Sequence, residues 1–170
     1  LALAAAADGV TVSYEYSNNE VTIGSAITSW NIAEVSFGDS SVSASGSTLL
    51  RMVDGDWDLN PDVINTKAVD LTSDSDSGGI QVTLTETTSD SGIFEGTLFF
   101  TTSGASSGSI LRVSEGDTVT LEFEDTTLPS PYSSSDVLTV AATATVGTAF
   151  PPLERAPAAN ARVVDAFGNS

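Results

Sequence analysis

Alternation of apolar and polar residues at every second position is the feature that most constrains how this chain folds. It is clearest in VTVSYEY (10–16), IQVTLTET (80–87) and TVTLEFE (118–124), where β-branched and aromatic residues take many of the apolar positions. Because the side chains of an extended strand point alternately to its two faces, this period predicts β-strands. The spacing of three and four residues that a helix requires is nearly absent. The sequence therefore predicts an all-β chain.

Short segments rich in Ser, Gly, Asp and Asn divide the chain into about nine such stretches, and these residue types favour turns. Many short strands joined by short turns are typical of an antiparallel β-sandwich, and we predict one of the Ig-like kind. The predicted strands are 10–16, 27–37, 48–53, 63–73, 80–87, 93–102, 110–113, 118–124 and 136–146. The predicted core residues are Trp30, Phe37, Leu84, Phe94, Phe99, Leu121, Phe123 and Val140.

Two of these core residues, Phe94 and Phe99, lie in the same predicted strand and are separated by an odd number of positions. Regular pleating would place them on opposite faces of the sheet. The sequence therefore predicts either a bulge at Gly96 or an exposed contact surface that includes one of the two rings.

Composition divides the chain into four segments. Residues 9–148 form the predicted sandwich, which is long enough to bury a core without disulfides. The Ala-rich residues 1–8 fit either a linker from a preceding domain or the remnant of a signal peptide. Residues 149–158 are rich in proline and predict a semi-rigid linker. Residues 159–170 predict the first strand of a following domain or a strand donated to a neighbouring molecule.

The charge balance excludes several classes of partner. The chain has 23 acidic and 5 basic residues, which give a formal net charge of −18 at pH 7. Such a surface repels nucleic acid and anionic lipid, and it attracts cations. No apolar run reaches the length of a membrane span. We therefore expect no nucleic-acid partner and no membrane-spanning segment.

The lack of histidine and cysteine narrows the chemistry further. It removes Ser-His-Asp and Cys-His nucleophile systems, and it removes histidine zinc sites. A pair of carboxylates acting on a glycosidic bond remains, but no stretch distinguishes such a pair from the general acidity. The sequence therefore predicts a protein that is not an enzyme.

One acidic stretch, DGDWDLNPD (54–62), has the pattern of a calcium-binding loop. Calcium takes six to eight oxygen ligands, and alternate acidic or amide side chains supply them in short loops. The stretch is not an EF-hand, because Leu59 stands where that loop requires glycine. A solvated acidic loop is the alternative, and magnesium suits all-protein cages less well. The predicted ligands are Asp54, Asp56, Asp58, Asn60 and Asp62.

Other acidic stretches predict structural roles. SDSDSGG (73–79) is typical of a turn, because Asp side chains and glycines favour turns. Glu86, Asp90 and Glu95 belong to a hairpin-like connection in which they are able to approach one another. Glu122 and Glu124 share one face of a predicted strand that ends at Asp125, and this pattern predicts a solvated sheet face.

Three longer stretches, taken in order, resemble a known family. They are VDGDWDLNPDVINT (53–66), SDSDSGGIQVTLTETTSDSGIFEGTLFF (73–100) and LRVSEGDTVTLEFEDTTLPSPY (111–132). Together they resemble a module of the surface-layer (S-layer) proteins of ammonia-oxidising archaea, over roughly residues 50–148. The family's acidic motif usually has proline at the position of Gly55 and often has an acidic residue at that of Asn65.

The resemblance implies a secreted structural protein built of tandem Ig-like sandwiches. Such proteins assemble with identical subunits into a porous coat outside the cell membrane, and divalent cations help to order it. It also implies that the negative pores gather ammonium at the cell surface. The residues that fall on the family's acidic motif are the five predicted calcium ligands.

Two other functions fit parts of the sequence. A filament or pilus subunit would use the N-terminal segment or ARVVDAFGNS (161–170) to complete the sheet of a neighbour. A carbohydrate-binding module would stack a sugar on Trp57, next to the acidic stretch. We expect instead that Trp57 caps the loop against the sandwich.

Overall fold

The computed structural model describes residues 9–18, 20–27 and 29–147. The predicted segments 1–8, 149–158 and 159–170 lie outside the described residues. Nearly all regular structure is β, and the helical element of the described chain is a single 3₁₀ turn, η1 (Gly55–Trp57). The all-β prediction is therefore confirmed.

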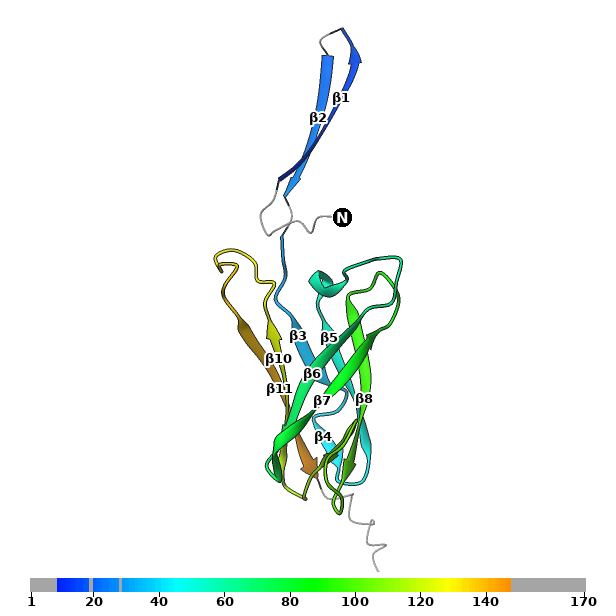
Figure 1. Ribbon diagram of the computed structural model, residues 1–170, viewed down its shortest axis with the longest axis vertical. Helices are drawn as coiled ribbons and strands as arrows, with labels where there is room; N and C mark the ends of the chain where they lie inside the picture. The colour runs from blue at the N-terminus through cyan, green and yellow to red at the C-terminus, as the bar shows by residue number, and fades with distance from the viewer. Residues whose placement is uncertain (1–8, 19, 28, 148–170) are drawn as a thin grey trace, which may run out of the picture.

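Most strands belong to one curled, nine-stranded sheet that resembles a sandwich (Figure 1). Its order is β3-β5-β8-β7-β6-β10-β11-β4, and β9 pairs with β8. The β4–β11 and β8–β9 pairs are parallel, and the other pairs are antiparallel. The strands are β3 (Glu34–Phe37), β4 (Ser41–Ser43), β5 (Ser47–Val53), β6 (Thr66–Ser73), β7 (Asp76–Glu86), β8 (Ile93–Thr101), β9 (Ile110–Arg112), β10 (Thr118–Asp125) and β11 (Leu138–Gly147).

The two ends of the sheet approach each other, because β3 lies against β10 and β11 as well as pairing with β5. The alternation in the sequence then directs one set of side chains into the enclosed space. In β10, for example, Val119, Leu121 and Phe123 are buried, while Glu122 and Glu124 are exposed. The solvated face predicted for these two glutamates is confirmed.

Most of the predicted core residues lie in or against the core, and one does not. Leu84, Phe94, Leu121 and Phe123 are buried, and Trp30, Phe37 and Val140 are half-buried. Phe99 was predicted in the core, but 47% of it is exposed. The β5–β8 pairing runs through Gly96 without a register shift, so regular pleating turns Phe99 outward. Gly96 faces inward, where a Cβ would lie 2.7 Å from Cδ2 of Leu84.

The strands differ from the prediction in several places: β2 (Glu20–Ile27) was not predicted, and β7 begins at Asp76 and not at residue 80. The predicted strand 27–37 begins only at Glu34. The predicted strand 63–73 begins only at Thr66, because residues 54–65 form a long loop. Strand β4 lies within a Ser- and Gly-rich run, which carries little strand signal. Local alternation therefore located most strands, but not their ends.

Residues 9–27 were predicted as part of the sandwich, and they form a separate two-stranded sheet. Strand β1 (Gly9–Ser17) pairs with β2 (Glu20–Ile27), and every described residue of both strands is exposed. Figure 1 shows this hairpin extending away from the curled sheet. The nine-stranded sheet thus begins at Glu34.

Candidate functional site

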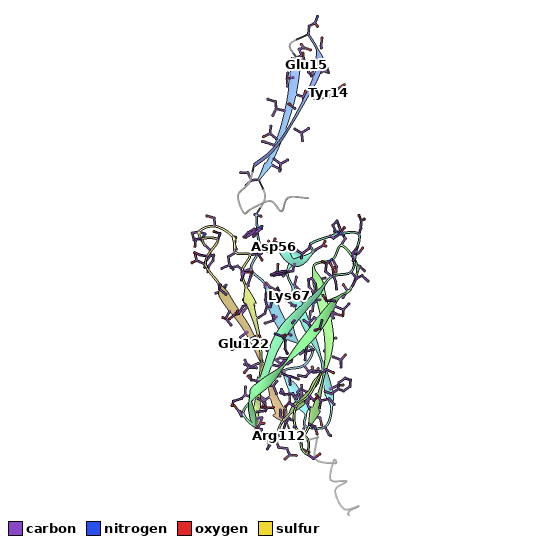
Figure 2. The ribbon with its side chains drawn as sticks, viewed as in Figure 1. Tyr14, Glu15, Asp56, Lys67, Arg112 and Glu122 are labelled. Atoms are coloured by element: carbon purple, nitrogen blue, oxygen red, sulfur yellow. The ribbon has the colours of Figure 1, made fainter. Side chains whose placement is uncertain are left out.

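Several loops meet at one end of the sandwich, which we call the Asp54 pole. Strands β5, β7 and β10 end there, and β6 and β8 begin there (Figure 1). Figure 2 shows Asp56 and Lys67 at this end. The whole predicted calcium loop therefore lies beside the β7–β8 connection and the end of β10. We define the pole as residues 54–65, residues 86–92, Lys67 and Asp125.

Asp54 is almost completely buried, with 1% of its surface exposed. It caps η1, because its Oδ1 accepts a hydrogen bond of 2.9 Å from the backbone N–H of Asp56. Its Oδ2 is buried and has no partner among the described residues. Burial raises the pKa of Asp54 to about 7; the N–H of Asp56 opposes this rise, and the charge of Asp125 adds to it. Such an oxygen is costly unless a proton, a water or a cation satisfies it.

Two more carboxylates of this pole hold the segment that precedes β3. Oδ2 of Asp56 accepts a hydrogen bond of 2.6 Å from the N–H of Asn31. Asp125 is fully buried at the end of β10, and its Oδ2 accepts one of 2.8 Å from the N–H of Ala33. Burial raises the pKa of Asp56, and the charge of Asp125 adds to the rise. The charge of Asp125 thus acts on both Asp54 and Asp56 at this pole.

Lys67 is the single lysine of the sequence, and it lies at the edge of this acidic group. Its Nζ is 2.9 Å from the ring centroid of Trp57 and 5.3 Å from that of Phe123. Burial lowers the pKa of Lys67, while the charges of Asp54 and Asp125 oppose that change. Among the described residues it forms no ion pair within 4.0 Å with either carboxylate. Lys67 therefore reduces the negative charge of the pole without cancelling it.

Trp57 packs against the hydrophobic core from η1, as we predicted for a residue that caps the loop. Its Nε1 is buried without a hydrogen-bond partner among the described residues. The ammonium of Lys67 lies over the ring. A sugar would have to compete with that ammonium for this face of the ring, so the arrangement gives little support to carbohydrate stacking.

Asp58 faces a different part of the pole. Its Oδ1 is buried and has no partner within the described chain. Burial raises its pKa, and the nearby charges of Glu86 and Asp90 raise it further. A second carboxylate oxygen of the predicted loop is therefore without a hydrogen bond.

Glu86, by contrast, is fully engaged. Its Oε1 accepts hydrogen bonds from the N–H groups of Ser91 (3.0 Å) and Gly92 (2.9 Å), and its Oε2 accepts one from that of Asn65 (3.1 Å). Burial alone would raise the pKa of Glu86, but these hydrogen bonds hold it below its usual value. Glu86 thereby joins the predicted calcium loop to the β7–β8 connection.

The last two predicted ligands form a local turn on the surface. Oδ1 of Asn60 accepts a hydrogen bond of 3.2 Å from the N–H of Asp62, and both residues are exposed. The side-chain amide of Asn65 donates to the carbonyl of Asn60 at 3.4 Å. The carboxylate of Asp62 in this turn is therefore exposed to solvent.

The five predicted ligands therefore occupy three places: Asp54 with Asp56, Asp58 beside Glu86, and the exposed Asn60 with Asp62. Over the described part of the chain, no three acidic side chains converge as the ligands of one ion. The donor chemistry nevertheless suits a hard cation, because two buried carboxylate oxygens have no partner. The calcium site stays a prediction.

Sequence reasoning missed the contribution of Asp125 and Lys67. The alternation that buries Leu121 and Phe123 also places Asp125 on the inward face of β10, and this signal was present in the sequence. Lys67 was not recognisable, because its place depends on pairing between distant strands. The antiparallel β10–β6 ladder brings the two strands together as far as Glu122 and Asp70, and the charge of Asp125 beyond its end still acts on Lys67.

An open surface pocket of about 320 Å³ lies next to the Asp54 pole, where β6 and β10 cease to pair. Two of its lining residues are acidic and one is basic, so it offers little to an anion. Its lining residues are Thr66, Lys67, Ala68, Asp70, Gln81, Phe123 and Glu124.

Comparison with known proteins identifies no family for this chain. No protein-family model matches the chain, and no curated protein matches it. Within the described residues, the structure contains no helix of the length and apolar character that crossing a bilayer demands.

Proposed function

We propose that this chain is a structural module of an acidic, cation-binding S-layer protein, which assembles with identical subunits into a porous extracellular lattice. The curled all-β sheet is consistent with one module of such a protein, and the Ig-like assignment belongs to the proposal. The function would be mechanical and electrostatic, with no catalytic role.

The observation that carries the proposal is the meeting of the three family-like stretches at the Asp54 pole. The first stretch supplies Asp54 and Asp58, the second supplies Glu86, and the third supplies Asp125. These residues are distant in the sequence, yet the charge of Asp125 adds to the raised pKa of Asp54 and that of Glu86 adds to the raised pKa of Asp58. A shared site explains why the three stretches occur together.

Calcium would act at this pole by replacing missing hydrogen bonds. The buried oxygens of Asp54 and Asp58 have no partner in the described chain, and a divalent cation would satisfy them and reduce repulsion among the carboxylates. The ligands would come from Asp54, Asp56, Asp58, Asn60 and Asp62. Because such an ion binds only the folded loop, it would stabilise the fold by mass action.

The surface charge supports the second part of the proposal. Between residues 29 and 147 the sequence has eighteen acidic and three basic residues. A lattice built from such modules would carry a strongly negative potential in its pores, and that potential would concentrate cations such as ammonium.

The test is a melting curve of the whole chain in EGTA and in millimolar calcium. At one hundred times the dissociation constant, calcium would add about 2.7 kcal/mol to the free energy of unfolding. For a chain of this size, we expect a rise of about 5–10 °C in Tm. The double substitution Asp56→Ala with Asp58→Ala should remove most of that rise.

The matched control is Glu122→Ala, which removes a carboxylate from the exposed sheet face away from the pole (Figure 2). It should keep the full calcium effect. Identical melting curves of the unsubstituted chain in EGTA and calcium would refute the cation site. Electron microscopy of calcium-treated protein would test the lattice separately, since an ordered array is the expected result.

A second candidate, a filament or pilus subunit assembled by strand donation, is favoured by one observation. The N-terminal residues 9–27 form strands that the nine-stranded sheet does not include. In such a filament, deletion of these residues would abolish polymerisation, whereas removal of residues 159–170 would leave it intact.

A further inference from the structure

Strand β1 presents a long sheet edge that the described chain leaves uncovered. It pairs with β2 on one side, and all nine of its residues are exposed. In the large sheet, by contrast, the terminal strand β3 is partly covered by β10 and β11. A two-stranded hairpin is only marginally stable by itself, so this one gains stability from any further strand that pairs with it.

Most of the usual protections of a free edge are missing from this hairpin. Residues 9–27 contain no proline, lysine or arginine. Proteins commonly place such residues, or inward-pointing charges, on strands that must not pair with another chain. One protection is present at the tip, where the β1–β2 register shifts between Glu15 and Ser17. The regular edge therefore runs from Gly9 to Glu15.

The hairpin also offers an uncharged stretch through which two copies can approach each other, because its two acidic residues lie next to the tip. It carries two of the acidic residues, Glu15 and Glu20, whereas residues 29–147 carry eighteen acidic and three basic ones. Both charges lie next to the tip, so Val10, Val12 and Tyr14 (Figure 2 labels Tyr14) and their β2 partners Ala26, Gly24 and Thr22 form an uncharged stretch below it. Approach through this segment avoids direct contact between the acidic sandwiches.

We propose that β1 is a self-association edge, along which two copies of the chain pair antiparallel and join their hairpins into one four-stranded sheet. The proposal gives a molecular contact to the self-assembly proposed above, but it does not depend on calcium. Twofold pairing centred on Val12 uses the whole regular edge. It sets Val12 against Val12 of the second copy, Val10 against Tyr14, and Gly9 against Glu15.

This register is favourable for each pair of residues. Pairs of β-branched and aromatic side chains directly opposite each other stabilise antiparallel sheets. Glu15 meets a glycine, so no two like charges face each other across the new ladder. The alternative edge, β2, is a weaker candidate because Gly24 interrupts it and glycine lowers strand propensity.

Electrostatics selects the antiparallel orientation over the parallel one. Seven paired residues extend over about 20 Å, at roughly 3.4 Å per residue. Antiparallel pairing places the two sandwiches at opposite ends of that length, which is about twice the Debye length at 0.1 M salt. Parallel pairing would hold both sandwiches at the same end, where their charges repel most strongly.

The contact is small, so we expect weak association in solution. It lacks the roughly 800 Å² per partner that is usual for a stable complex. Dissociation constants of about 0.1–1 mM correspond to such a contact. A lattice or filament would strengthen it, because other contacts raise the effective concentration of neighbouring hairpins.

Cysteine cross-linking of the full chain tests both the edge and its direction, since the natural sequence has no cysteine. The variants are Gly9→Cys, where an added Cβ has open space around it, and Glu15→Cys. Under mild oxidation, an equal mixture should give at least five times more disulfide dimer than either variant alone. Strong dimers of each variant alone would overturn the antiparallel register, and no dimers in any sample would overturn self-association.

Sedimentation velocity of two matched variants tests the edge without cysteines. Val12→Lys and Ile23→Lys change residues on β1 and β2 that are equally exposed, at 66% each. Val12→Lys should abolish the concentration-dependent rise in sedimentation coefficient, because two lysines would face each other, whereas Ile23→Lys should preserve it. Equal behaviour of the two variants would overturn the choice of β1.

These measurements are made in EGTA and repeated in calcium, so they separate the two proposals. Cross-linking in EGTA with no effect of calcium on Tm would retain the hairpin contact and reject the cation site. A calcium-dependent Tm without cross-linking would do the reverse.

Discussion

Two acidic clusters at opposite ends of the sandwich have similar sequences and different surroundings. DGDWD (54–58) and SDSDS (73–77) both repeat Asp at every second position. The first belongs to the Asp54 pole. The second lies at what we call the Asp117 pole, defined as residues 73–79 and 106–118, where Figure 2 shows Arg112. The sequence pattern alone does not distinguish them.

At the Asp117 pole, backbone amides satisfy the carboxylates. Oδ2 of Asp117 accepts hydrogen bonds from the N–H groups of Ser75 (3.2 Å) and Ser114 (2.8 Å). Oδ2 of Asp74 accepts one of 2.7 Å from the N–H of Thr118. Burial would raise the pKa of Asp117, but hydrogen bonds from the two serines outweigh it and lower the pKa. These carboxylates thus tie two turns together.

Asp76 completes this pole in the same way. Its Oδ1 accepts a hydrogen bond of 3.2 Å from the N–H of Gly79, and its Oδ2 accepts one from the hydroxyl of Ser106. The hydroxyl of Ser106 is the main reason that the pKa of Asp76 is lowered. A turn is present within the predicted stretch 73–79, but it is limited to residues 74–75, because Ser73 ends β6 and Asp76 begins β7.

The difference shows what separates a structural acidic turn from a candidate cation site. At the Asp117 pole, hydrogen-bond donors face the carboxylates of Asp76 and Asp117 and lower their pKa values, which favours the ionised form. In the Asp54 pole, burial exceeds the available donors, so oxygens of Asp54 and Asp58 remain unpaired and the pKa values of both residues rise. Only the second environment gains from a bound cation.

The largest predicted effect concerns Gly79, a glycine of the Asp117 pole. Gly79 has φ of 60°, and a Cβ there would lie 2.1 Å from the carbonyl oxygen of Leu71, within the β6–β7 ladder. Gly79→Ala should therefore cost about 3–4 kcal/mol, from the left-handed backbone and the clash together. Urea denaturation of the variant measures this loss.

The matched substitution at the Asp54 pole is Gly92→Ala. Gly92 has φ of 59°, and its Cβ would lie 2.7 Å from Cα of Gly55. Because this neighbour belongs to a loop and not to a ladder, it is freer to shift, and we expect a loss of about 2 kcal/mol. An equal loss in the two variants would mean that the Asp54 loop is as rigid as the ladder.

The next effect compares the carboxylates themselves. Asp117→Ala should cost about 2–3 kcal/mol, because it leaves two amides without their charged acceptor. Asp54→Ala in EGTA should cost less than about 1 kcal/mol, since it loses a helix cap but also removes a buried, unpaired oxygen. Chemical denaturation at pH 8 measures both, and a larger loss at Asp54 would contradict the comparison.

The sequence was a good guide to the strands because alternation is a local property. The same alternation indicates that Asp125 is buried and that Phe99 is exposed. We nevertheless predicted Phe99 in the core and made no prediction about the burial of Asp125. In both cases the prediction followed the chemical type of the residue, a carboxylate or an aromatic ring, and not its position in the alternating pattern of the strand. Position in the strand alone predicts an inward-facing Asp125 and an outward-facing Phe99.

The candidate site was less predictable, because its properties depend on long-range pairing. Whether an Asp meets an amide is decided by loops that are distant in the sequence, as with Asp117 and Ser75 or Asp56 and Asn31. The separate hairpin was equally hidden, since exposed and buried strands share the same alternation. A sequence pattern indicates which oxygens are present, and the fold determines which of them lack partners.

A smaller effect than that of Asp117→Ala is a pH dependence that belongs to the Asp54 pole only. The pKa of Asp54 is raised to about 7, so the folded chain holds a proton that the unfolded chain releases near pH 4. The resulting stabilisation is complete below that lower pKa and is lost as the pH rises through the higher one. In EGTA, the free energy of unfolding should fall by about 1.4 kcal/mol between pH 6 and pH 8.

Asp54→Asn isolates this contribution, because the amide keeps the oxygen that caps η1 and does not titrate. The chain has no histidine, so few other groups change charge in this interval. The variant should lose most of the decline between pH 6 and pH 8, and at pH 8 in EGTA it should be more stable than the unsubstituted chain. In calcium the order should reverse, since the ionised carboxylate is the better ligand. Parallel pH profiles for the two proteins in EGTA would show that Asp54 is ionised in the folded chain, and the contrast between the poles would then fail.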